Sequence, residues 1–214
     1  GRVSVNGEVT TELGTRVVAG RDVVAVDGVV VEIQAKKWIA FHKPVGVLTP
    51  QSDPHGGRTI YDVLPDEFSA LRYVGRLDRP TEGLLLLTND GDAANGLLHP
   101  GREVEREYSV VVAGVMDEAA VNRLRRGVEL DDGPARPKSV RVVERGELDT
   151  TLALVLTEGR KREVRRMLLA VNFGVQRLVR TRFGRVRLER LASGEWRKLS
   201  AFEIESLLDL SSLK

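Results

Sequence analysis

Four consecutive leucines at residues 84–87 restrict the fold of this chain more than any other segment. They are followed by Thr88 and by the turn signal Asn89-Asp90-Gly91. A short apolar run that ends in such a turn is typical of a buried strand, because a half-exposed strand alternates apolar and polar residues. We therefore predict a buried strand at Leu84–Thr88, which requires a sheet around it.

The segments on either side of this strand mix helical and strand patterns without a regular strand–helix alternation. We predict a strand at 38–42, a short helix at 92–98, strands at 107–113, 139–144, 150–157 and 176–183, and helices at 118–126, 160–171 and 203–208. This order favours an α+β fold with a mixed, mostly antiparallel central sheet.

A small β unit precedes the main domain. Two hairpin signals, Asn6-Gly7 and Asp27-Gly28, lie within residues 1–33 between short runs of valine. The segment has too little apolar mass to be a domain by itself. We therefore divide the 214 residues into an N-terminal segment, 1–33, and a main domain, 36–214.

Composition excludes several kinds of site. The chain has no cysteine, so disulfides and thiolate metal ligands are excluded. Its three histidines are scattered along the sequence, and we expect no metal site. No signal segment and no apolar run of membrane-spanning length is recognisable, so we expect a cytoplasmic protein, and a monomer without a membrane partner.

Charge is distributed unevenly along the chain. Residues 1–33 carry a net charge of −2, whereas residues 158–198 hold thirteen basic and four acidic residues, a net charge of +9. A basic C-terminal half is compatible with a polyanionic partner and, equally, with a solvated surface that has none.

Three segments carry side chains suited to chemistry. Asp78 lies on a loop between two predicted strands and is flanked by Arg76 and Arg79, which would keep a carboxylate ionised. Tyr108 follows the charged run 102–107, where a strand tyrosine most often serves the core. The segment 157–167 would form a helix with a dense basic face, which is also typical of an ordinary amphipathic helix.

The complete string Gly75–Gly91, with Gly-Arg-Leu-Asp followed by Thr81 and Gly83, closely resembles the active-site motif of the RsuA/RluB-type pseudouridine synthases. The resemblance covers about residues 36–200 and implies the catalytic fold of that family. It also implies a catalytic role for Asp78 and a role for Arg76 in extruding the target base.

The same resemblance assigns roles to the other two segments. Tyr108 matches the active-site tyrosine that stacks on the base, and Arg165, preceded by the apolar Val164, matches the basic residue that pairs with the aspartate. Many members have His-Gln before this pair, whereas this chain has Arg162-Glu163, a variant that resembles the B-type enzymes of large-subunit ribosomal RNA.

Further elements complete the resemblance. Lys43-Pro44-Val45-Gly46 is similar to the family's Lys-Pro-x-Gly turn, a structural or RNA-backbone element, and we expect Lys43, Arg160 and Arg162 to bind the substrate. Residues 1–33 resemble the C-terminal part of an S4 RNA-binding domain, whose two recognition helices would precede Gly1.

The implied reaction converts one uridine of 23S ribosomal RNA to pseudouridine. It needs no cofactor, since neither redox change nor group transfer occurs. Asp78 would either bond to C1′ or remove the 2′ proton, a choice that the sequence leaves open. We expect ribosomal RNA, in a stem or loop, as the partner.

Several alternatives remain at this point. A 16S enzyme of the RsuA type is the first, and an E- or F-type large-subunit enzyme is the second. A non-catalytic S4-type RNA-binding or ribosome-assembly protein would need the basic face but not Asp78. A glycosidase would need a second carboxylate, for which Glu82 is the nearest candidate.

Overall fold

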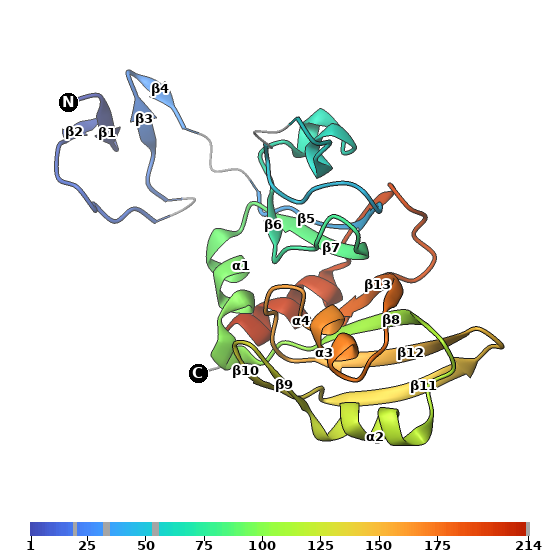
Figure 1. The fold of residues 1–214 in the computed structure, drawn as a ribbon. Coiled ribbons are helices and arrows are strands. Elements are labelled where there is room, and N and C mark those ends of the chain that lie inside the picture. Colours follow the sequence, from blue (N-terminus) through green and yellow to red (C-terminus); the bar gives the residue numbers. More distant parts are fainter. Residues whose placement is uncertain (19–20, 32–34, 53–55, 213–214) are drawn as a thin grey trace. The chain divides into compact units, whose positions relative to one another are not determined.

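The computed structural model describes residues 1–18, 21–31, 35–52 and 56–212 (Figure 1). The chain divides into two compact units, Gly1–Lys36 and Lys37–Lys214. Residues 32 and 33 of the predicted N-terminal segment lie outside the described residues, as do residues 53–55 of a polar loop in the main domain.

The first unit is a small antiparallel sheet in the order β2-β1-β3-β4. Its strands are β1 (Val3–Val5), β2 (Glu8–Thr10), β3 (Val24–Val26) and β4 (Val29–Val30). Both predicted hairpins are confirmed, because Asn6 and Asp27 adopt φ of 52° and 51°, as the tight turns of hairpins require. Val9 and Val29 remain 65% and 71% exposed, so this unit buries little apolar surface.

The second unit is built on one nine-stranded sheet, in the order β11-β12-β8-β13-β7-β5-β15, with β14 beside β13 and β6 beside β7. The strands are β5 (Trp38–Lys43), β6 (Arg72–Val74), β7 (Glu82–Thr88), β8 (Arg106–Ala113), β11 (Ser139–Arg145), β12 (Asp149–Leu156), β13 (Val175–Phe183), β14 (Val186–Arg187) and β15 (Trp196–Lys198). The hairpin of β9 (Val128–Leu130) and β10 (Gly133–Ala135) stands apart from it.

The leucine run becomes β7, and both of its faces are buried. Leu85 and Leu87 belong to one core cluster, Leu84 and Leu86 belong to the other, and all four side chains have no exposed surface. A strand with a core on each face cannot alternate with polar residues, which explains the uninterrupted run. The predicted buried strand is therefore confirmed.

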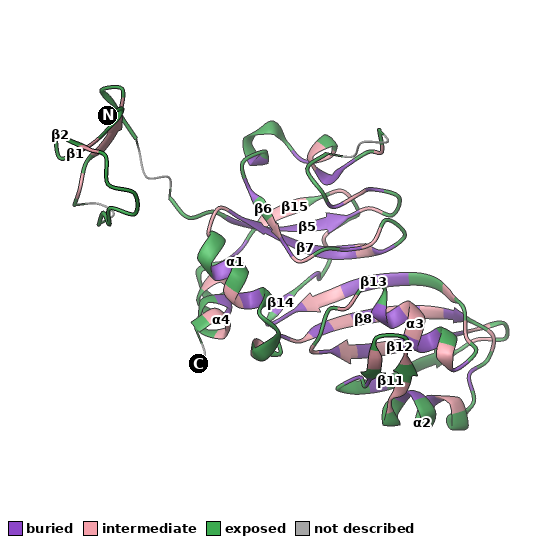
Figure 2. Cartoon of the chain, turned by 60° about the vertical axis from the view of Figure 1, so that its left-hand side comes forward, coloured by how far each residue is buried: buried purple, intermediate pink, exposed green. Residues whose placement is uncertain are grey.

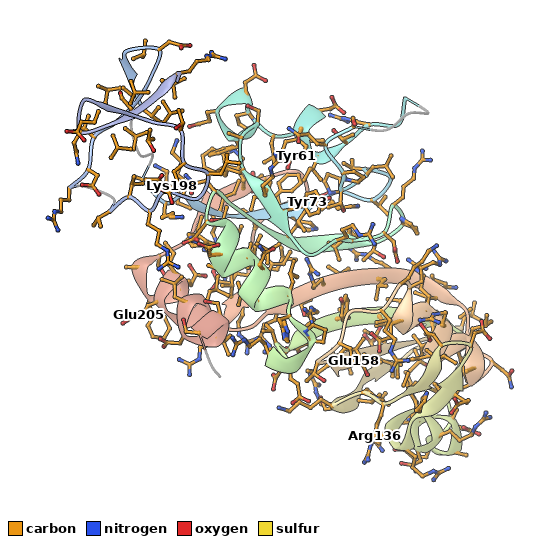
Figure 3. The ribbon with its side chains drawn as sticks, turned by 90° about the vertical axis from the view of Figure 1, so that its left-hand side faces the viewer. Tyr61, Tyr73, Arg136, Glu158, Lys198 and Glu205 are labelled. Carbon is orange, nitrogen blue, oxygen red and sulfur yellow. The ribbon has the colours of Figure 1, made fainter. Side chains whose placement is uncertain are left out.

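Helices cover the two faces of the sheet (Figure 2). Apolar residues of α2 (Glu118–Arg126) and α3 (Glu163–Ala170) enter the first cluster, against which Tyr61 and Tyr73 also pack (Figure 3). Residues of α1 (Gly91–Leu98) and α4 (Ala201–Ser212) enter the second. Single turns of 3₁₀ helix occur at Ile60–Asp62, Asp66–Phe68 and Pro100–Arg102. In the described ranges, no helix is both long enough and apolar enough to cross a membrane.

The expected α+β fold with a mostly antiparallel sheet is confirmed, but three details differ. The helix predicted to begin at Arg160 begins at Glu163, because Arg162 adopts a left-handed conformation with φ of 52°. The β9–β10 hairpin and β15 were not predicted. β15 is a three-residue edge strand whose pairing with β5 bridges more than 150 positions, a contact that short-range patterns do not contain.

One pairing joins the two halves of the sheet. β13 runs parallel to β7, with Val179 opposite Glu82 and Arg180 opposite Gly83, whereas the other strand pairs of the described sheet are antiparallel. The loop that carries Asp78 leads directly into β7, so this loop reaches the sheet at the join.

Candidate active site

The loop Gly75–Thr81 connects β6 to β7 and presents Asp78. Leu77 anchors it: its N–H donates to the Thr49 hydroxyl at 3.2 Å, and that hydroxyl donates to the Leu77 carbonyl at 2.7 Å. The N–H of Thr81 donates to the Asp78 carbonyl at 3.0 Å and closes the turn. Asp78 is half-buried, and within the described residues no side-chain hydrogen bond engages its carboxylate. The loop is therefore held by its backbone, and the carboxylate is left available.

Arg165 reaches the same loop from α3. Its guanidinium donates to the Pro80 carbonyl at 2.8 Å and to the Val175 carbonyl at 3.3 Å. Burial lowers the pKa of Arg165, the nearby Arg162 lowers it further, and the attraction of Asp78 raises it. Arg165 thus holds the aspartate loop by its backbone and interacts with the carboxylate through charge. The structure therefore brings Arg165 close to Asp78, and both were singled out from the sequence.

Lys43 lies beneath the loop with no exposed surface. Its ammonium donates to the Thr81 carbonyl at 2.7 Å and to the Pro44 carbonyl at 2.9 Å. Complete burial argues against the predicted contact between Lys43 and RNA, because the ammonium has no path to a phosphate in this conformation. Lys43 instead ties the end of β5 to the beginning of β7.

The charge of Lys43 makes stability depend on pH. Burial lowers the pKa of Lys43 to about 8 from its ordinary 10.5, while Asp78 and Glu82 act in the opposite direction. Between these two values the unfolded chain retains a proton that the folded chain has released, so the contribution of this group to stability increases as the pH rises.

Comparison with Lys43→Met isolates this effect. From about pH 7 to about pH 9.5, we expect the unfolding free energy of the wild type to rise by about 1–2 kcal/mol relative to the variant, in urea titrations of both proteins. Parallel pH profiles for the two proteins would contradict the assignment.

Tyr108 and Val164 are buried in the same core cluster as Leu77, the neighbour of Asp78 on the loop. Tyr108 lies on β8, is 9% exposed, and stands opposite Arg180 of β13. Val164, in the first turn of α3, is 4% exposed and belongs to the same core cluster as Tyr108. The core cluster therefore connects Tyr108 and Val164 to the loop that carries Asp78.

The remaining predicted residues differ in their surroundings. Arg76 and Arg162 are exposed, and no hydrogen bond of either side chain occurs in the part of the chain that the structure describes. Arg160, in contrast, is engaged by Glu158, by Asp132 and by the carbonyls of Asp132 and Gly133 in the β9–β10 hairpin. The guanidinium of Arg160 therefore stabilises the approach to α3.

Glu82, the second carboxylate considered from the sequence, already has two close partners. It accepts a hydrogen bond from Arg177 at 2.7 Å, and its other oxygen lies 3.8 Å from Nε2 of His42. These contacts leave it poorly suited as the acid of a glycosidase. No group of three histidine, aspartate or glutamate side chains in the described ranges is arranged to hold a metal ion.

Comparison with known proteins shows which family this chain belongs to. A model of the RNA pseudouridylate synthase family matches residues 37–170, which include the Asp78 loop, Tyr108 and Arg165. The chain belongs to this family. The RNA pseudouridylate synthases are isomerases, and this membership confirms the resemblance on which the sequence-based prediction of activity rested.

Relatives of this pseudouridylate synthase match along its whole length. An uncharacterized RNA pseudouridine synthase of Aquifex aeolicus (strain VF5) is 41% identical over 100% of this chain and 86% of its own length. Ribosomal large subunit pseudouridine synthase B of Vibrio vulnificus (strain CMCP6) is 44% identical over 100% of this chain and 69% of its own. The enzyme of that name from Escherichia coli (strain K12) is 41% identical, with 100% and 76% covered.

A solved structure supports the same fold. A crystal structure of a pseudouridylate synthase superposes with a TM-score of 0.75 at 28% identity and covers 96% of this chain and 88% of that one. An H/ACA ribonucleoprotein structure, at a TM-score of 0.52 and 18% identity over 71% of this chain and 48% of that chain, shares the fold alone.

Sequence reasoning did not single out three buried polar residues of this synthase, Thr49, Arg106 and Arg180, of which Thr49 holds the Asp78 loop through Leu77. Arg106 and Arg180 offered a signal, since each lies two residues from an inward-facing Tyr108 or Leu178 and therefore on the same face of its strand. Thr49 offered none, because its contact with Leu77 spans 28 positions.

Proposed function

We propose that this synthase isomerises a uridine of large-subunit ribosomal RNA and that Asp78 acts on the ribose of the target nucleotide. The observation that carries the proposal is a carboxylate without a side-chain hydrogen bond in the described residues, on a loop that Arg165 holds through the Pro80 carbonyl. The names of the Vibrio and Escherichia relatives support the choice of RNA.

The chemistry begins at the glycosidic bond. The C1′–N1 bond breaks with its electron pair going to the uracil, and the sugar becomes electron-poor at C1′. A carboxylate in contact with the ribose stabilises that state or bonds to it. Arg165 and Lys43 help to hold the Asp78 loop through its backbone carbonyls, and the negative charge of Asp78 attracts both of these cations.

The detached uracil must then turn without leaving. Its C5 faces C1′, a C–C bond forms, the C5 proton departs, and N1 takes up a proton. We propose that the ring of Tyr108 stacks on the base and that Val164 closes the pocket on the apolar side. Loss of the base to water would leave an abasic site, so a tight apolar wall is a requirement of the reaction.

Exposed cationic side chains are available to bind RNA. We propose that Arg76 and Arg162, which no partner in the described residues engages, contact the target nucleotide and its phosphates. Arg160 and Lys43 are assigned positioning roles, because their cationic groups already serve the protein.

The salt dependence of RNA affinity tests whether the exposed arginines contact the phosphates. With about four phosphate contacts, affinity for an rRNA stem-loop should fall roughly 50- to 150-fold between about 50 and about 200 mM salt. Arg76→Gln should reduce the slope of log affinity against log salt by about one, whereas the matched change Arg141→Gln, on the outer strand β11, should not. Affinity that does not respond to salt would contradict the electrostatic role.

The activity itself is tested with unmodified large- and small-subunit ribosomal RNA that carries tritium at uridine C5. Release of tritium from the large-subunit RNA alone is the expected result. Release from small-subunit RNA alone would replace the substrate by that of a 16S enzyme. Free uracil as the product would instead support glycosidic hydrolysis, and no release from either RNA would reject the ribosomal substrate.

A further inference from the structure

Arg180 is a charged residue in the middle of the sheet. Its side chain is 2% exposed, and its Nε donates to the Leu84 carbonyl of β7 at 2.7 Å. Its Nη2 is buried without a hydrogen-bond partner among the described residues, and no carboxylate there forms an ion pair with it. A buried cation with an unused donor costs several kcal/mol, so a role beyond packing is required to account for it.

The neighbours of Arg180 show which side of the site it serves. It stands directly opposite Tyr108 in the antiparallel β8–β13 pair, so the two side chains share one face of the sheet. Burial lowers the pKa of Arg180, and the electrostatic attraction of Tyr108 acts in the opposite direction. The guanidinium carbon also lies 5.5 Å from the centre of the Phe183 ring. Tyr108 is therefore its polar partner on the site face.

We propose that Arg180 is a positioning residue that sets the place of Tyr108 relative to the Asp78 loop. One edge of its guanidinium holds the Leu84 carbonyl, in the strand that the loop enters, and in this proposal the other edge contacts the Tyr108 hydroxyl. The proposal rests on the proposed function, because the position of the tyrosine matters only if its ring holds the base.

The planar guanidinium suits this task better than any other cation. Its donors lie in a fixed fork, so a bond at Nε determines where the Nη groups point. A lysine has one flexible ammonium and cannot hold two acceptors on different strands at set angles. A fixed tyrosine keeps the detached uracil oriented while its C5 turns towards C1′, and small displacements of reacting groups are costly.

A double-mutant cycle separates this role from a purely structural one. Arg180→Met, Tyr108→Phe and the double variant are compared with the wild type for the maximal rate of C5 tritium release and for the KM of the RNA. In the wild-type background, Arg180→Met should lower the maximal rate about 10- to 100-fold with little change in KM. In the Tyr108→Phe background, the same substitution should lower the maximal rate by less than about 2-fold. An equal loss in both backgrounds overturns the proposal.

Folding is monitored by thermal unfolding of every variant. If Arg180→Met does not fold, Arg180→Lys replaces it in the cycle with the same expectations. If neither variant folds, the sheet itself requires the arginine and the proposal fails.

A second measurement needs no turnover. Nitrogen-15 NMR of the arginine side chains should show slow exchange of the Arg180 guanidinium protons in the wild type and faster exchange in Tyr108→Phe. An unchanged signal overturns the contact. A wild type that shows this coupling but releases no tritium would reject the proposed function and leave the Arg180–Tyr108 contact standing.

Discussion

Asp78→Ala is expected to reduce tritium release from large-subunit ribosomal RNA by a factor of about 10⁴ or more, with little change in RNA affinity. The carboxylate is the group proposed to act on the ribose. The loop Gly75–Thr81 contains no second acidic residue that could replace it. The measurement is single-turnover release of C5 tritium, with RNA binding followed in parallel.

Two controls belong to this experiment. Asp78→Asn keeps the shape of the side chain and should lose as much rate as the alanine variant, because it is the charge that is required. Glu67→Gln removes an exposed carboxylate in the turn Asp66–Phe68 and should leave the rate unchanged. A residual rate above about a tenth of the wild type would remove Asp78 from the reacting centre.

Folding of the Asp78 variants should change little, since the half-buried carboxylate makes no hydrogen bond in the described part of the chain. Its removal also takes away an attraction that raises the pKa of both Lys43 and Arg165. We therefore expect a small loss of stability, within about 1 kcal/mol, that is too small to explain a lost reaction.

Gly83→Ala is expected to cost about 3 kcal/mol or more of unfolding free energy, or to prevent folding. A Cβ at this position would lie 2.4 Å from the Arg180 carbonyl oxygen and 2.6 Å from the Arg180 nitrogen, and both atoms are backbone. The residue also adopts φ of +109°, which an alanine tolerates poorly. The parallel pairing of β7 with β13 would have to open, and the Asp78 loop, which leads into β7, would shift with that strand.

Gly133→Ala is the matched control. Gly133 has a similar φ of +102°, but no atom lies within 4 Å of the added Cβ, so this variant carries the conformational cost alone, about 1–2 kcal/mol. Urea unfolding of both variants measures the difference that is due to the close approach of the strands. Equal losses would show that the join tolerates a side chain.

Much of the secondary structure follows from short-range patterns. The turn residues Asn6 and Asp27 have the positive φ that hairpins need, and Asp117 and Asp90 accept hydrogen bonds at the beginnings of α2 and α1. The helix α3 is an instructive exception. Glu163 turns its carboxylate towards the Arg160 backbone N–H, at 3.1 Å, and Arg162 takes a left-handed conformation that delays the helix by three residues.

The candidate site likewise contains some residues that the sequence identifies and others whose role only the structure shows. Asp78, Tyr108 and Arg165 were recognisable because each stands in a string of residues whose order is itself informative. Lys43 and Arg160 were recognisable as cations, but the sequence could not show that one is buried under the loop and the other is held by Asp132 and Glu158. Whether a cation faces RNA or protein depends on what packs against it.

The sequence by itself determined most of the strands of the main domain, which loop carries the aspartate and, through the run Leu84–Leu87, that the strand after this loop is buried. Those features depend on residues close together in the chain. Only the tertiary structure decided that β13 lies beside β7, that Gly83 must leave room for the Arg180 backbone, and that Arg180 faces Tyr108. These contacts join residues dozens of positions apart, and the energies of packing and burial that select them belong to the whole sheet.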